Sequence, residues 1–329
     1  MMACLCLFSG DPCMDYRIVQ GGYHMYPDLQ PVPLSQASGP VAYNMTNDAL
    51  FHIVFQNNHK ALTGLIASLL HLDPSSIRNI VIQNPLIYGH QPQEKNTVLD
   101  ILVSYNDGSI MDLEMQVHNF YNWIPRSLYY LCREYTNLHH GDDYSQVKPV
   151  YHVGFLDYTL FNGQTSFYST YRMSDLKTGN VYSDKLTLAV VELNHIDMAT
   201  EEDKAYGIDK WAALFKSTTW EEVKMLAQTD PYIESAAESM YSSVTEPWVL
   251  ELCKKSQEEI DGDRHRRERL AEQDRQIAEN EKQIAKNERQ IAERDKEIAE
   301  LKSQNAELSK QIAELRAMLT EQAMSSPLT

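Results

Sequence analysis

Two alternating apolar segments around the turn residues Asn-Asp-Gly at 106–108 predict a β-hairpin. Residues 98–105 and 110–117 place an apolar side chain at nearly every second position, which is typical of strands with one buried face. The glycine of the turn can adopt the left-handed conformation that closes a three-residue loop, so Tyr105 is expected to pair with Ser109. This register determines which side chains share a face.

In the predicted register, Asp100 lies opposite Glu114 with Cβ atoms roughly 4.5–5.5 Å apart. The predicted polar face carries Asp100, Ser104, Asp112, Glu114 and Gln116, and Leu102 alone breaks the pattern. The predicted core face carries Leu99, Ile101, Val103, Tyr105, Met111, Leu113, Met115 and Val117. A two-residue turn would shift the pairing by one and send the two carboxylates to opposite faces.

The other apolar patterns predict helices and strands in mixed order. Thr46 or Asn47 can cap a helix that carries Leu50, Phe51, Val54 and Phe55. Further helices are expected at residues 61–70, from Pro125 or Arg126 to about 138, and over 201–257. Further strands are expected at 77–82, 150–156, 165–172 and 186–193.

The composition indicates one globular domain with an extension. The chain has 329 residues, 43% of them hydrophobic, and apolar residues become sparse after about residue 255. A net charge of −17 argues against a broad basic DNA platform, although a metal-dependent nuclease with a local basic groove remains compatible with it. Five cysteines without a Cys-x-x-Cys pair indicate neither a disulfide framework nor a zinc site. No run approaches the roughly 20 apolar residues that span a membrane, so a cytoplasmic protein is expected.

Several motifs resemble the PD-(D/E)xK nuclease superfamily, and specifically its transposase-like branch of recombination-promoting nucleases. The similar segments are Asn47-Asp48-Ala49-Leu50-Phe51, Leu99-Asp100, Leu113-Glu114-Met115-Gln116, Arg126-Ser127-Leu128-Tyr129-Tyr130, Gly141-Asp142-Asp143-Tyr144, Lys148-Pro149-Val150, Val191-Glu192-Leu193 and Trp211. The first resembles the opening helix of the family, the second its first metal-binding strand, and the third a Glu-x-Gln variant of its Glu-x-Lys motif. The resemblance covers about residues 44–260.

This resemblance implies an α/β fold with a restriction-endonuclease-like core, in which helices flank a central mixed sheet. The expected domains are a disordered leader (1–43), a nuclease-like domain (44–200), a helical extension (201–261), a coiled coil (262–322) and a disordered tail (323–329). A start at Met14, Met25 or Met45 is left open.

Phosphodiester hydrolysis explains why such a site contains carboxylates. Hard Mg²⁺ with oxygen ligands polarises the phosphate and lowers the pKa of its bound water. The resemblance implies that Asp100, Glu114 and the Met115 backbone carbonyl hold Mg²⁺ or Mn²⁺. It also implies that Gln116 orients the water and that Asp48 completes the shell or accepts a proton. An isolated pair of strand acids would more simply be solvated, but the surrounding motifs favour the metal site.

Two positions depart from the family pattern. Gln116 stands where the wider superfamily has Lys, and His52 stands where the family often has Lys. The Gln116 variant is common within the branch, but it leaves no cation at the position that holds the attacking water or the scissile phosphate. Slow cleavage is compatible with this change.

Candidate DNA contacts follow the hairpin. Arg126 is a candidate phosphate clamp, and Tyr129 and Tyr130 are candidates for stacking on bases, although a Tyr-rich helical face more often packs in a core. His139-His140 most simply caps a helix. A basic cluster either contacts DNA phosphates or forms a solvated hinge, and comprises Arg264, Arg266, Arg267 and Arg269.

The C-terminal segment repeats with a period of seven residues. The repeating positions are Leu270, Ile277, Ile284, Ile291, Ile298, Asn305, Ile312 and Leu319. Taken as heptad position a, they predict a left-handed coiled coil whose d positions become leucine from Leu301 onward. Ile at a with Leu at d favours two parallel strands, and Asn305 fixes their register. A lone charged helix is the alternative, because several d positions are polar.

These features predict a Mg²⁺-dependent DNA endonuclease that acts as a homodimer, because cutting both strands of a duplex requires two sites. The alternative is a catalytically weak or inactive nuclease-fold protein in which the coiled coil serves as an interaction or DNA-binding module.

Overall fold

The computed structural model describes residues 18–19, 22–23, 32–83, 101–106, 108–135, 143–163 and 165–325, with side chains to residue 318. Contacts divide the chain into two compact units, Met1–Gly262 and Asp263–Thr329. Of the helices that are described, none is both long and apolar enough to cross a membrane.

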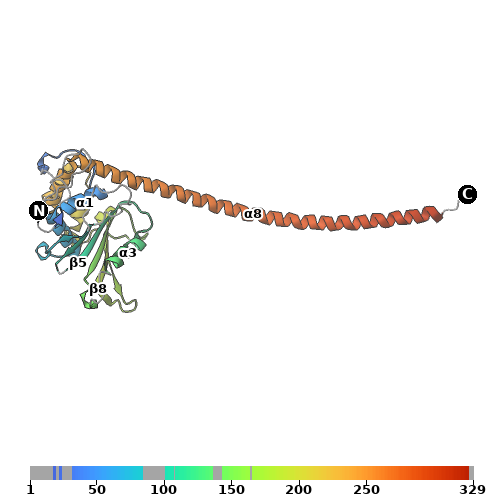
Figure 1. Cartoon of the computed structure of the whole chain (residues 1–329), viewed down its shortest axis with the longest axis horizontal. Helices are drawn as coiled ribbons and strands as arrows, with labels where there is room; N and C mark the ends of the chain where they lie inside the picture. The colour runs from blue at the N-terminus through green and yellow to red at the C-terminus, as the bar shows by residue number, and fades with distance from the viewer. Residues whose placement is uncertain are drawn as a thin grey trace, which may run out of the picture. The chain divides into compact units, whose positions relative to one another are not determined.

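A six-stranded mixed sheet forms the centre of the first unit, in the order β3-β4-β5-β6-β8-β7 (Figure 1). Its strands are β3 (Val81–Ile82), β4 (Ile101–Tyr105), β5 (Ser109–Gln116), β6 (Val150–Leu156), β7 (Tyr168–Ser174) and β8 (Val181–Glu192). β5, β6 and β8 are parallel, and the other pairs are antiparallel. A separate antiparallel pair consists of β1 (Ile18–Val19) and β2 (Gly22–Tyr23). The mixed sheet and its helices agree with the predicted fold class.

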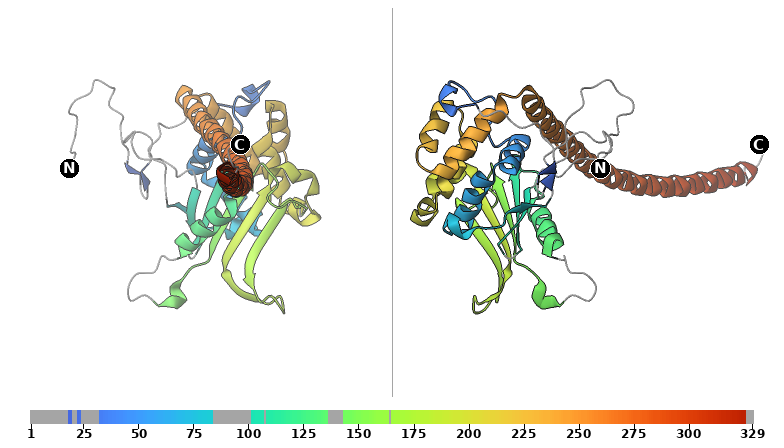
Figure 2. Two further views of the ribbon diagram at one scale, coloured as in Figure 1. Left: turned by 90° about the vertical axis from the view of Figure 1, so that its right-hand side faces the viewer. Right: turned by 60° about the vertical axis from the view of Figure 1, so that its left-hand side comes forward.

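Helices cover both faces of this sheet, with α1 and α2 on one side and α3 on the other (Figure 2). The α-helices are α1 (Asp48–Asn57), α2 (His59–Leu70), α3 (Trp123–Tyr135), α4 (Glu201–Ala205), α5 (Ile208–Lys216), α6 (Trp220–Ala227), α7 (Pro231–Val244) and α8 (Pro247–Ser325). Short 3₁₀ helices are η1 (Leu34–Gln36), η2 (Pro74–Ser76), η3 (Tyr144–Gln146) and η4 (Leu193–Met198). Asn47 caps α1, as predicted, by accepting a hydrogen bond from the backbone N–H of Leu50.

The predicted hairpin register is confirmed over the described residues. Tyr105 pairs with Ser109, and Ile101 pairs with Leu113. The loop between them closes with Asn106 at φ 51° and with positive φ also at its glycine. The apolar face is buried, as Ile101, Val103, Met111 and Leu113 show no exposure.

An aromatic cluster fills the core between the sheet and the helices on this side. Phe51 of α1 lies 5.7 Å from Phe155 of β6, and Phe155 lies 5.1 Å from Phe215 of α5, measured between ring centroids. α1 is therefore held against the sheet by its hydrophobic face, and this contact fixes where the first residue of α1, Asp48, lies.

Several element boundaries differ from those predicted. Of the strand expected at 77–82, only Val81–Ile82 pairs with β4, while Ile77 packs into the core. α3 begins at Trp123, two residues before the predicted Pro125. β8 begins at Val181, earlier than the predicted residue 186, because its first residues extend an exposed hairpin with β7 that has no apolar alternation.

Residues 32–43, which the sequence assigns to the leader, pack against the helical part of the first unit. The backbone N–H of Val32 donates to the Ser242 hydroxyl (3.1 Å), and Pro40 forms a bridge with Thr219. Leu34 and Ala37 are buried. The apolar side chains of Leu34 and Ala37 explain why this segment is packed against the helices. The proline and glycine content of the leader does not predict this packing.

Helix α8 begins in the first unit, where Val249 and Cys253 are buried. In the second unit it is continuous, and its apolar side chains at the heptad positions are exposed in the single chain. They are Leu270, Ile277, Ile284, Ile291, Ile298, Leu301, Leu308, Ile312 and Leu315. The helix is therefore present, while its pairing with a second copy and the register role of Asn305 stay predictions.

Candidate functional site

The polar face of β5 is buried beneath α3. Asp112, Glu114 and Gln116 alternate along the strand and are 2%, 4% and 8% exposed. The sequence predicted that these side chains share a face, and it did not predict that a helix covers them. Burial of two carboxylates in a row is costly unless neighbouring groups compensate their charge.

Arg126 and His152 are polar neighbours of the Glu114 carboxylate. Arg126 Nε lies 2.7 Å from Glu114 Oε1, and His152 Nε2 lies 3.6 Å from Glu114 Oε2. Burial nevertheless raises the pKa of the Glu114 carboxyl, against the opposing effect of Arg126 and of His152. Arg126 thus faces into the protein from α3 and contacts the carboxylate that the sequence predicted as a metal ligand.

His152 of β6 is a site residue that sequence reasoning missed. Its Nδ1 lies 3.0 Å from Asp112 Oδ2, and the two residues are direct neighbours in the parallel ladder of β5 and β6. The imidazole lies against two α3 rings, with centroids 5.4 Å from Trp123 and 6.2 Å from Tyr130. Asp112, His152 and Glu114 therefore form one buried chain of polar contacts. Since Asp112 and His152 are 40 positions apart in the sequence, only the strand register reveals it.

Asp48 reaches the same region from the start of α1. The pKa of its carboxyl is raised to about 7, chiefly by burial and also by the Glu114 carboxylate, while Arg126 opposes the shift. Asp48 is therefore close enough to Glu114 and Arg126 for their charges to act on its carboxyl. A carboxyl that titrates near neutral pH is suited to accepting a proton.

Two more groups lie where the parallel strands end. Tyr158 follows β6, and Glu192 is the last residue of β8, 3.6 Å from His195 Nε2 through its Oε2. Burial raises the pKa of the Tyr158 hydroxyl, and Glu114 and Glu192 both add to this shift. Burial also raises the pKa of Glu192. The carboxyl ends of parallel strands are the usual location of binding sites in open α/β sheets. Glu192 lies in a motif of the resemblance, which was the only sequence signal for it.

The remaining predicted site residues differ in their burial and in whether the structure describes them. Asp100 lies outside the described residues, although the ladder next to it follows the predicted register up to the pair of Ile101 and Leu113. Met115 is buried with its side chain on the core face. Tyr129 is exposed, whereas Tyr130 is half-buried against His152.

The residues present fit a hard cation in donor type. Asp48 Oδ1, Glu114 Oε2 and Gln116 Oε1 are buried, and none accepts a hydrogen bond from the described residues. Carboxylate and amide oxygens are the ligands that Mg²⁺ prefers. In the described segments, which leave out Asp100, no three His, Cys, Asp or Glu side chains are grouped closely enough to hold a metal ion.

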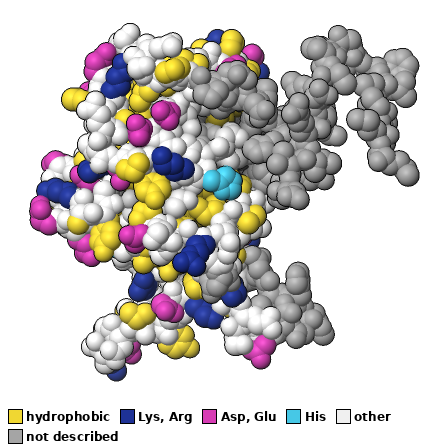
Figure 3. Space-filling view, turned by 90° about the vertical axis from the view of Figure 1, so that its left-hand side faces the viewer, with side chains coloured by type: hydrophobic (Ala, Val, Ile, Leu, Met, Phe, Trp, Pro, Cys, Tyr) yellow, Lys and Arg dark blue, Asp and Glu magenta, His cyan; other side chains and the backbone are white. Residues whose placement is uncertain are grey.

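The face of the molecule in Figure 3 shows no broad basic platform for DNA among the described residues. On the face in Figure 3, lysine and arginine side chains are interspersed with acidic and apolar ones, and the described residues there form no continuous basic stripe. The cationic group beside the carboxylates is therefore local, namely Arg126.

Comparison with known proteins gives one match. The family model described as PD-(D/E)XK nuclease family transposase matches residues 45–265, which include every element from α1 to the start of α8. No curated protein and no solved structure matches the chain.

Proposed function

Since the chain belongs to the family of PD-(D/E)XK nuclease family transposases, we propose that it is a DNA endonuclease that hydrolyses phosphodiester bonds with Mg²⁺ or Mn²⁺. The observation that carries the proposal is a set of three buried oxygens, Asp48 Oδ1, Glu114 Oε2 and Gln116 Oε1, none of which accepts a hydrogen bond in the described part of the chain. Leaving buried carboxylate oxygens without donors costs stability, and cation binding offsets this cost.

Each residue of the proposed site has a proposed role in binding the cation or in hydrolysis. Asp100, Glu114 and the Met115 carbonyl hold the cation, which supplies charge neutralisation and a more acidic water when bound. Gln116 orients the attacking water through its amide. Asp48, whose pKa is about 7, accepts the proton that this water loses.

Arg126 and the exposed Tyr129 are the proposed DNA contacts. The Arg126 guanidinium is held beside Glu114, and its planar donors match the oxygens of a phosphate group. Tyr129 lies on the same helix and is 65% exposed, so its ring is accessible to a base. Tyr130 is a weaker candidate for stacking on a base, because its ring is already stacked against His152.

Dimerisation through α8 completes the proposal. Its heptad stripe is exposed among the described residues of the single chain, and two copies would bury it as a parallel coiled coil with Asn305 at an a position. Two symmetric sites then serve the two strands of a duplex.

A plasmid assay tests the proposal. The full chain, Asp100→Ala, Glu114→Ala and the control Asp184→Ala, an exposed strand acid outside the site, are incubated with supercoiled plasmid and Mg²⁺. We expect nicking by the parent and the control and none by the two site variants. Equal nicking by all four proteins would indicate a contaminant. No nicking by any would favour the alternative, a nuclease-fold interaction protein whose activity was lost with Gln116.

A further inference from the structure

A cavity lies on the opposite face of the sheet from Glu114. Its volume is about 590 Å³, and its floor is formed by Met111, Val153 and Ala189. These residues belong to the α1 and α2 side of the sheet, whereas Glu114 and His152 project to the α3 side. The cavity is therefore separate from the proposed nuclease site, and its volume is typical of a small-molecule site.

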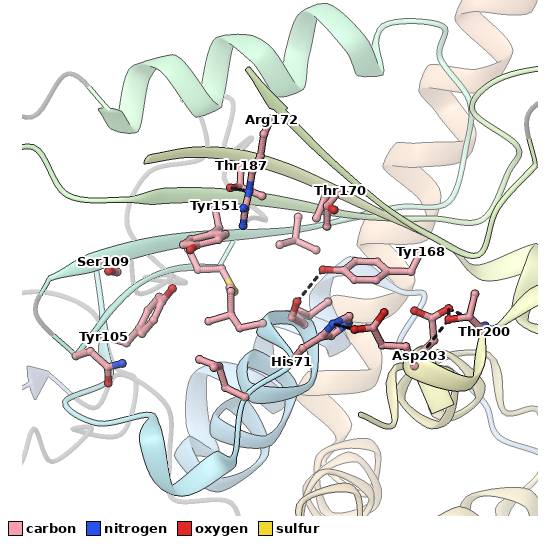
Figure 4. Close-up of a pocket in the computed structure, with 18 residues that line it drawn as sticks. His71, Tyr105, Ser109, Tyr151, Tyr168, Thr170, Arg172, Thr187, Thr200 and Asp203 are labelled. Atoms are coloured by element: carbon pink, nitrogen blue, oxygen red, sulfur yellow. Dashed lines mark hydrogen bonds and ion pairs between the residues drawn. The ribbon is translucent and has the colours of Figure 1, made fainter. Parts of the chain in front are cut away.

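Aromatic rings form the walls of this cavity. Tyr105, Tyr151 and Tyr168 line it from three different strands, and Figure 4 shows their rings around the open space. The Tyr168 hydroxyl donates to the Leu69 carbonyl (2.7 Å), which fixes this ring in place. Fixed rings above an apolar floor favour a planar aromatic ligand, because stacking on such rings does not depend on a specific hydrogen-bond pattern.

Arg172 is the one arginine in the described lining of the cavity, which contains no lysine. Glu202 pairs with His71 (3.3 Å), and Asp203 accepts hydrogen bonds from the backbone and hydroxyl of Thr200. The guanidinium of Arg172 extends over Thr187 toward Tyr151 (Figure 4), and Nε donates to the Thr187 hydroxyl (3.3 Å). Within the described residues Arg172 forms no ion pair, so its remaining donors can receive an anion.

We propose that this cavity binds a nucleotide, with the base between the tyrosine rings and the phosphate on Arg172. The proposal does not depend on nuclease activity. Two features of the cavity indicate this class of ligand. One is the apolar space between the tyrosine rings, and the other is the Arg172 guanidinium at the rim, which forms no ion pair within the described residues. Thr170 and Thr187 also line the cavity and add hydroxyl groups to it.

Calorimetric titration of the full chain in EDTA tests this assignment, with adenosine 5′-monophosphate as the probe. EDTA removes cations that would hold the probe at the Glu114 site. We expect saturable binding at one site per chain. Adenosine and ribose 5-phosphate should each bind at least about tenfold more weakly, because each lacks one of the two recognised groups.

Three variants distinguish specific from general binding. Arg172→Gln should weaken binding of adenosine 5′-monophosphate at least about tenfold and leave that of adenosine unchanged. Thr170→Trp, at an exposed rim position, should abolish binding by filling the cavity. Arg78→Gln, an exposed arginine that does not line the cavity, should bind as the parent does. Absence of binding by the parent, or equal weakening by Arg78→Gln and Arg172→Gln in proteins with unchanged circular dichroism, would overturn the proposal.

Discussion

Arg126 of α3 and Glu114 of β5 form an ion pair with an N–O distance of 2.7 Å, and the Glu114 side chain is only 5% exposed. This contact joins the helix that carries the candidate DNA contacts to the strand that carries the candidate metal ligand. The carboxylate is therefore maintained in a buried position by a residue that is itself a candidate for phosphate binding.

Removing this guanidinium should destabilise the protein. Arg126→Gln leaves the Glu114 carboxylate with weaker compensation, and we expect a loss of about 1–3 kcal/mol in the free energy of unfolding at pH 8. Urea denaturation measures it. The control is Arg133→Gln on the same helix, whose partner is Glu134 and whose side chain is half exposed, for which less than about 1 kcal/mol is expected. Equal losses would contradict the special role of the Arg126 contact.

Asp112 and His152 should be energetically coupled. Both side chains are buried and their nearest polar atoms are 3.0 Å apart. Either single substitution therefore leaves the other buried group without this partner. A double-mutant cycle with Asp112→Asn and His152→Phe should give a coupling energy of about 0.5–3 kcal/mol in urea unfolding. Additive effects of the two substitutions would rule out the contact.

Gly154 should not tolerate a side chain. A Cβ at this position would lie 2.1 Å from Trp123, which covers His152, so Gly154→Ala is expected to cost about 1–3 kcal/mol. Combining it with Trp123→Leu should cost less than the sum of the two. Gly262→Ala, where no atom lies within 4 Å of the added carbon, is the control and should be neutral or stabilising. Stability of Gly154→Ala equal to that of the parent would contradict the packing.

Asp48 should make stability depend on pH. Its pKa in the folded protein, about 7, exceeds the ordinary value of 3.8, so between these values the folded state binds more protons than the unfolded state. The contribution of Asp48 to the stability of the metal-free protein therefore falls as the pH rises from about 4 to 7. Asp48→Asn removes the titrating carboxyl, so the urea midpoint of this variant should decline less steeply with rising pH than that of the parent. The control Asp184→Asn should not change this slope. An unchanged slope in Asp48→Asn would disprove the shift.

The heptad stripe of α8 should drive self-association of the full chain. Ile298→Lys with Ile312→Lys places charges on the predicted seam and should convert a dimer into a monomer in sedimentation equilibrium. Ser303→Lys, at heptad position f on the outer side, should remain dimeric. A monomeric parent protein would remove the dimer from the proposal.

The sequence alone predicted the local part of the site. Alternation along 98–105 and 110–117 predicted the pairing of Tyr105 with Ser109 and the burial of Met111 and Leu113, because strand period and turn geometry are properties of neighbouring residues. The position of Asp100 itself lies outside the described residues and stays a prediction.

The non-local part was beyond reach of the sequence. Whether Glu114 faces solvent or a helix depends on how α3 packs over the sheet, and the pairing of Asp112 with His152 depends on the register of two strands that are distant in the chain. No residue pattern within a single element encodes either arrangement. The same applies to Arg172, whose cavity is lined by six separate segments of the chain.

Metal binding by Glu114 tests the central claim most directly. Mn²⁺ is titrated by calorimetry into metal-free parent protein and into Glu114→Gln, which keeps the size of the side chain and removes its charge. The account predicts saturable binding at one site per chain in the parent and at least about tenfold weaker binding in the variant, because the neutral amide lacks the charge with which a carboxylate binds a divalent cation. Equal Mn²⁺ affinity in two proteins with the same circular dichroism would contradict it.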